Sequence, residues 1–78
     1  MIAPAWVVLT HAPDQIIAEA WIDILRQEGI PARLAAGDVA SYLGPSPFPC
    51  RILTPEHLAD RAAEALADWG VVRDYSAR

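Results

Sequence analysis

The sequence contains no lysine and one cysteine in 78 residues, and each shortage excludes a class of chemistry. A Walker-A phosphate-binding loop and a Schiff-base mechanism are both excluded, because each depends on a lysine amine. A single cysteine, Cys50, excludes an intramolecular disulfide, a C-x-x-C redox pair and a cysteine zinc site. We expect Cys50 to be a buried, inert thiol, and its unpaired state favours the reducing cytoplasm.

Long apolar runs and basic clusters are also missing. The apolar run at residues 1–9 is interrupted by Pro4 and has no basic leader, so we expect neither a signal peptide nor a membrane span. Six arginines stand singly among ten acidic residues, giving a net charge of −4, and no basic stripe is visible. We therefore expect a cytoplasmic protein with no nucleic-acid and no membrane partner.

The residues available for a core are few. The apolar share is 54%, but 15 of these residues are alanine, which leaves 27 larger apolar or aromatic side chains. A chain of this length buries about 60% of the surface that it exposes when unfolded, so its stability margin is thin. We expect one domain over residues 1–78, with an ordered core at about 5–70 and a short strand or flexible tail at 71–78.

The first half of the chain has the pattern of a strand followed by a helix. Residues 5–10 are a continuous apolar, β-branched run, typical of a central strand that is buried on both faces. Helical spacing then predicts a helix over 14–28, with Asp14 as its N-cap and Gly29 as its left-handed C′ residue. The apolar side of this helix is expected to contain Ile17, Trp21, Ile24 and Leu25, continued by Glu28, with Ala18 and Ala20 alongside.

The second half begins with a strand and a long loop. Residues 30–35 alternate between apolar and other residues, and Pro31 favours the start or the edge of a sheet. Residues 37–49 are rich in glycine and proline and form a loop, with room for one helical turn at 38–43.

A third strand at 50–53 and a second helix complete the pattern. Thr54 is expected to be the N-cap of this helix, followed by Pro55 at the first helical position, and Gly70 ends it. Its apolar side is expected to consist of Leu58, Ala62, Leu66 and Trp69. A fourth strand starting at residue 71 is optional, because its pattern is lost within two residues.

The order βαββα, with the optional fourth strand, predicts an α+β fold. Right-handed crossovers place both helices on one face of the sheet, which gives a two-layer sandwich of the ferredoxin-like type. The name describes architecture alone, since one cysteine cannot hold an iron–sulfur cluster, and no cofactor is expected.

Several of these residues resemble a known family. The sequences Ala18-Glu19, Glu28-Gly29-Ile30-Pro31-Ala32 and Thr54-Pro55-Glu56, with Leu25 and Leu34, are similar to a small family of prokaryotic signal-transducing proteins. That family is a domain of unknown function that is grouped by fold with the nitrogen-regulatory PII-like proteins. The resemblance implies a ferredoxin-like fold, a regulatory or binding role, and a functional loop at 37–49. It implies no catalytic residue.

Four polar residues are candidates for a small-ligand site. The predicted topology brings His11, Asp14, Asp38 and Tyr42 to the same end of the sheet, where they form a candidate acid/base or ligand site. A simpler interpretation makes His11 an exposed turn residue and Asp14 a helix cap. We expect no metal site.

The first strand indicates an interface. Trp6 and Val8 point to one side of the sheet and Val7 and Leu9 to the other, while Leu53 joins one of these pairs. Because the helices cover one face, we expect the other face, or the edge of the first strand, to mediate a homodimer or small homo-oligomer with Trp6 as its anchor. In the alternative, Trp6 is covered by residues 37–49 or by the tail.

These observations predict a non-enzymatic regulatory or protein-interaction module that self-associates, because the sequence contains no activated nucleophile and no paired carboxylates. The alternative is a PII-like small-ligand sensor with its site near the 37–49 loop.

Overall fold

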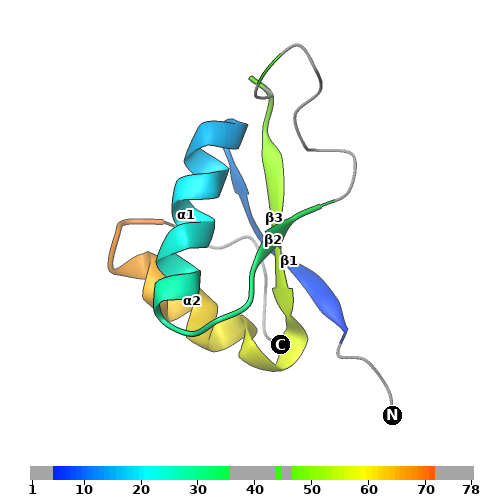
Figure 1. Ribbon diagram of the computed structural model, residues 1–78. Coiled ribbons are helices and arrows are strands. Elements are labelled where there is room, and N and C mark those ends of the chain that lie inside the picture. The colour runs from blue at the N-terminus through cyan, green and yellow to red at the C-terminus, as the bar shows by residue number, and fades with distance from the viewer. Residues whose placement is uncertain (1–4, 36–43, 45–46, 72–78) are drawn as a thin grey trace.

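A computed structural model describes residues 5–35, 44 and 47–71, which form two layers (Figure 1). One layer is a three-stranded antiparallel sheet of β1 (Trp6–Ala12), β2 (Arg33–Leu34) and β3 (Cys50–Pro55). The other contains α1 (Gln15–Gln27), the 3₁₀ turn η1 (Glu56–Leu58) and α2 (Ala59–Ala67). Both helices lie on one face of the sheet, as expected for a two-layer α+β sandwich (Figure 1). The predicted helical turn at 38–43 and most of the optional fourth strand lie outside the described residues.

The strand order is β1-β3-β2, so β3 is the middle strand of the described sheet. The prediction that β2 lies at an edge is confirmed for the described sheet. β1 has β3 on one side, and most of the optional fourth strand that would make β1 central lies outside the described residues. The apolar run of β1 reflects apolar side chains on both of its faces, and that property does not depend on having a neighbour at each edge. β1 is also longer than predicted, since its pairing with β3 continues through His11 and Ala12.

Both ends of α1 follow from the sequence. The Asp14 carboxylate accepts a hydrogen bond of 2.9 Å from the Ile17 amide, which is the predicted N-cap. Gly29 has φ +78°, and the amides of Gly29 and Ile30 donate to the carbonyls of Arg26 and Leu25. This pair of bonds is the Schellman motif, which satisfies carbonyl groups that the helix end would otherwise leave unpaired.

The buried side of α1 is rotated from the predicted one. Ala18, Ile22 and Leu25 are buried, at positions i, i+4 and i+7, whereas Ile17 is 36% exposed and Glu28 is exposed. Trp21 and Ile24 pack against the margin of the core. Leu25 belongs to both sets, whereas the buried Ala18 and Ile22 each lie one position after the predicted Ile17 and Trp21, which rotates the buried side about the helix axis.

Thr54 is not a helix cap, contrary to the prediction. It belongs to β3, is fully buried, and its hydroxyl donates a 2.9 Å hydrogen bond to the Pro31 carbonyl. The bond ties the segment leading into β2 to the middle strand. Helical structure therefore begins one residue later than predicted, with the 3₁₀ turn η1 at Glu56 instead of Pro55, and α2 follows from Ala59.

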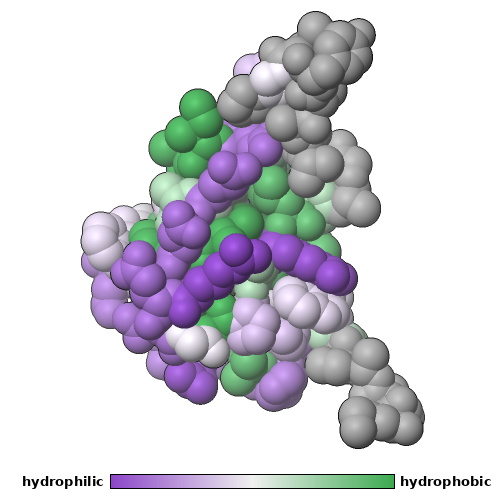
Figure 2. Space-filling view, in the orientation of Figure 1, coloured by the Kyte–Doolittle hydropathy of each residue, from purple (hydrophilic) through white to green (hydrophobic). Residues whose placement is uncertain are grey.

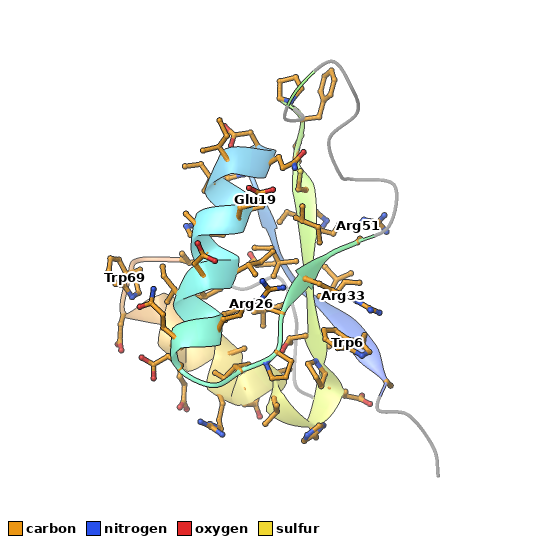
Figure 3. The ribbon with its side chains drawn as sticks, in the orientation of Figure 1. Trp6, Glu19, Arg26, Arg33, Arg51 and Trp69 are labelled. Atoms are coloured by element: carbon orange, nitrogen blue, oxygen red, sulfur yellow. The ribbon has the colours of Figure 1, made fainter. Side chains whose placement is uncertain are left out.

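The second helix confirms Leu58, Ala62 and Leu66 as inward residues, but the expected burial of Trp69 is wrong. α2 ends at Ala67, and Trp69 is 68% exposed beyond it (Figure 3). The predicted stop is confirmed, since Gly70 has φ +80° and the amides of Gly70 and Val71 donate to Ala67 and Leu66. Because this second Schellman motif turns the chain after Leu66, Trp69 does not continue the helical stripe.

The core lies between the sheet and the two helices. Its large, fully buried aliphatic side chains among the described residues are Leu9, Leu25, Ile52 and Leu66, and each contributes about 1.5–3 kcal/mol. Cys50 is also fully buried there, as predicted, and its thiol donates to the Phe48 carbonyl at 3.4 Å.

Replacing Gly29 with alanine is expected to lower the free energy of unfolding by about 1–2 kcal/mol, because an alanine must adopt left-handed backbone angles there. No atom lies within 4 Å of a β-carbon built on Gly29, so the loss is conformational and not steric. Urea unfolding measures it. Gln27→Ala, an exposed change two residues earlier, is the control and should stay within about 0.5 kcal/mol of the wild type. Equal stability of Gly29→Ala and wild type would contradict the left-handed conformation.

Candidate functional site

The face of the sheet opposite the helices is the candidate functional surface. Along β3, Cys50, Ile52 and Thr54 are buried beneath the helices, so Arg51 and Leu53, which alternate with them, point the other way. Directly paired residues share a face, which adds their partners from the outer strands. This surface, called the open face below, includes Trp6, Val8, His11, Arg33, Arg51, Leu53 and Pro55, the last of which pairs with Trp6.

No helix or strand of the described ranges 5–35, 44 and 47–71 lies over the open face. The ribbon shows both helices on the other side of the sheet, and Figure 3 shows Trp6, Arg33 and Arg51 extending away from α1. Three of its apolar members, Trp6, Val8 and Leu53, are half-buried, and Pro55 is buried. The predicted interface residues therefore lie on one face, and Leu53 joins Trp6 and Val8 instead of Val7 and Leu9.

A β-bulge in β1 decides which residues reach this face. Val8 pairs with Leu53 and Thr10 pairs with Ile52, so Leu9 is the extra residue of β1 between them. Leu9 and Thr10 are both buried, although they are consecutive. Strict alternation from Val8 would place Thr10 on the open face and His11 in the core. The bulge reverses this, and His11 lies on the open face opposite Arg51.

A cation–π contact joins the two edges of the open face. The Arg33 guanidinium carbon lies 4.3 Å from the centroid of the Trp6 ring, and the two side chains come from opposite outer strands. Leu53 of the middle strand lies between them, since it pairs with Val8 on one side and Arg33 on the other. The contact holds the long arginine side chain in one place above an apolar base, which reduces the entropy lost when a partner binds.

The predicted ligand site is not assembled among the described residues. His11 lies within β1 and not in the turn after it, and Asp14 uses its carboxylate to cap α1. Asp38 and Tyr42 lie outside the described residues, as does most of the 37–49 loop on which the sensor alternative depends. Across the ranges that the structure describes, no group of three or more histidine, cysteine, aspartate or glutamate residues is placed to hold a metal ion.

Sequence reasoning missed Arg33 and Arg51 as members of this surface. The position of Arg51 on this face can be predicted from strand periodicity, because it alternates with buried residues. The contact of Arg33 with Trp6 has no such local signal, because the two residues are 27 positions apart in the chain. The interpretation of the six arginines as isolated also needs correction, because folding brings two of them and a histidine to one side of the sheet.

Comparison with known proteins returned no match to any family model, any curated protein or any solved structure. The family resemblance noted in the sequence stays a prediction. Neither described helix is both long enough and apolar enough to cross a lipid bilayer.

A double-mutant cycle tests the Arg33–Trp6 contact. Arg33→Met and Trp6→Leu are expected to show a coupling energy of about 0.5–1 kcal/mol in chemical unfolding, because either change alone already removes the cation–π contact. Arg51→Met in the same cycle with Trp6→Leu is the matched control and should show no coupling beyond error. A coupling energy of zero for Arg33 would mean that its guanidinium does not rest on the ring in solution.

Proposed function

We propose that this protein is a non-enzymatic interaction module that self-associates through the open face. The observation that carries the proposal is the grouping of Trp6, Val8 and Leu53 on the side of the sheet that the described helices leave uncovered. Val8 and Leu53 pair directly, and Trp6 lies two residues along β1 from Val8. Together they make a continuous apolar centre with an aromatic residue of the kind enriched at binding hot spots.

The polar surroundings of this centre support a docking role. His11, Arg33 and Arg51 are exposed around the three half-buried apolar residues. An apolar centre with a polar margin is the usual organisation of a protein–protein interface, and arginine is among the residues enriched there. The small size of the described core gives a second reason, since a domain with few large buried side chains gains stability when a partner covers its apolar face.

The ferredoxin-like fold, the regulatory role and the cytoplasmic location are part of the same proposal. β1 and β2 are parallel to each other and each pairs antiparallel with β3, which lies between them and follows β2 in sequence. This is the arrangement of the split βαβ unit, and it supports the ferredoxin-like assignment. We assign the module a regulatory role in signal transduction, as the family resemblance implies. Its place is the cytoplasm, where Cys50 stays a thiol.

Sedimentation velocity over a range of micromolar concentrations tests self-association. The weight-average mass of the wild type is expected to rise above the 8.5 kDa of one chain as concentration increases. Leu53→Gln should weaken the association about tenfold or more, because it places a polar amide in the apolar centre of the interface. Val8→Gln is a second variant at the neighbouring position and should have the same effect.

Trp69→Gln is the matched control, since Trp69 is a large exposed apolar residue on the helical side of the molecule. It should associate like the wild type. That result would show that the open face mediates association and that exposed apolar surface elsewhere does not. Circular dichroism and urea unfolding confirm that each variant is folded. A wild type that stays monomeric over the whole range rejects the proposal, as does unchanged association in both open-face variants.

A further inference from the structure

A groove lies between α1 and the outer edge of β2. β2 pairs with β3 on one side, and no described strand pairs with its other side. The groove has a volume of about 430 Å³ and is lined by two aliphatic and four charged residues, which are Glu19, Ile22, Asp23, Arg26, Arg33 and Leu34. Figure 2 shows purple side chains over α1 and beside β2, with green side chains between them. Its volume is in the range of ligand-binding clefts, about 300–1,000 Å³.

The register of the sheet shows which backbone groups of β2 face the groove. The Ala35 amide donates a 3.0 Å hydrogen bond to the Arg51 carbonyl, which is the next position of the β2–β3 register. Hydrogen-bonded and non-hydrogen-bonded pairs alternate along an antiparallel ladder, so the amide and carbonyl of Leu34 point away from β3. The Ala32 carbonyl points the same way and accepts a 3.1 Å hydrogen bond from the Arg26 guanidinium. Leu34 thus offers both a donor and an acceptor at the edge.

Three of the four charged residues of the groove are oriented by partners other than one another. The Gln15 amide donates to the Glu19 carboxylate at 2.9 Å, and the Arg33 guanidinium rests on the Trp6 ring. Arg26 reaches from α1 toward the sheet to bond a backbone carbonyl before β2 (Figure 3). Stacking on a ring uses the flat face of the Arg33 guanidinium, and its N–H groups lie in the plane, where they are able to meet a carboxylate.

The two sides of β2 present different charges. Leu34 packs against the core on the helix side, where Ile22 also lines the groove. Glu19 is three positions before Ile22 and four before Asp23, so the two acids border the groove from one side of α1. Arg33 projects to the open face, away from α1 (Figure 3). Because side chains alternate along a strand, one added at this edge would meet carboxylates and a guanidinium in turn.

We propose that the edge of β2 binds an extended peptide segment of a partner protein, which joins the sheet antiparallel to β2. Antiparallel pairing lets one residue of the segment bond both backbone groups of Leu34. Paired residues share a face, so that residue enters the groove; a lysine or arginine there lays its aliphatic chain over Ile22 and brings its cation to Glu19 and Asp23. The next residue of the segment lies opposite Arg33, where an acidic side chain completes an ion pair.

Arg26 limits how far the added strand extends. Its guanidinium already covers the Ala32 carbonyl, so the segment gains its backbone hydrogen bonds chiefly at Leu34. Affinity therefore depends strongly on the basic residue in the groove and the acidic residue after it. The proposal goes beyond self-association through the open face, because it uses an edge of the sheet and a different partner.

Isothermal titration of the full chain with short peptides tests the proposal. The probe is Thr-Val-Lys-Glu-Val-Thr with blocked ends, so that lysine and glutamate carry its only charges. Thr-Val-Glu-Lys-Val-Thr has the same composition with the two charges exchanged and should bind about tenfold more weakly. Methylation of the backbone nitrogen of the probe's lysine removes the donor to the Leu34 carbonyl and should also weaken binding about tenfold. Methylation of the glutamate nitrogen, whose N–H faces away from β2, is the control and should have little effect.

Variants of the protein locate the groove. Glu19→Gln with Asp23→Asn should weaken binding of the probe about tenfold, because both carboxylates that face its lysine are lost. Glu64→Gln with Asp68→Asn removes two exposed acids at the same spacing on α2 and should bind like the wild type.

Three results would overturn the proposal. They are no binding of the probe to the wild type at millimolar concentration, equal affinity for the two charge orders, and equal effects of the two backbone methylations. Peptide binding by a wild type that stays monomeric would reject self-association and leave the added strand in place, so the two proposals fail separately.

Discussion

The hydrogen bonds that β3 makes to both outer strands are the interaction on which the rest of this structure depends. β1 and β2 do not pair with each other, so each keeps its place through its register with β3. That register divides the molecule into two chemically different sides. Cys50, Ile52 and Thr54 face the helices and build the core, whereas Arg51 and Leu53 face away from them. Thr54 adds a side-chain bond to Pro31 that fixes the entry into the short strand β2.

The bulge at Leu9 adapts β1 to this division. A strand with strict alternation cannot place both Leu9 and Thr10 in the core and return His11 to the opposite face. One extra residue in β1 allows this placement, because it shifts the pairing of β1 with β3 by one position after Val8. As a result His11 lies on the open face opposite Arg51. Trp6 and Val8 reach the same face through the regular pairing that precedes the bulge.

Features fixed by neighbouring residues were predictable from the sequence. The Asp14 cap and the glycine stops at Gly29 and Gly70 all appear as expected, because each involves hydrogen bonds within about one helical turn. Thr54 carried the same kind of local signal and the prediction was wrong. Its threonine hydroxyl is equally able to cap a helix or to bond a distant carbonyl, and the tertiary contact with Pro31 decided between the two. The helical spacing of Trp69 predicts a core position, but α2 ends at Ala67 and the side chain is exposed.

The sequence by itself determined the exclusion of lysine and disulfide chemistry, the type of the main elements, both ends of α1, the stop at Gly70, and the gathering of Trp6 and Val8 on one side of a strand. Composition and short-range spacing contain that information. The tertiary structure decided that β3 is the middle strand of the described sheet, that Leu53 joins Trp6, and that Arg33 and Arg51 share a face. These results depend on strand order, register and a bulge, which arise from pairing between residues far apart in the chain. Arginines that stand singly among acids in the sequence therefore form the cationic margin of one surface in the folded protein.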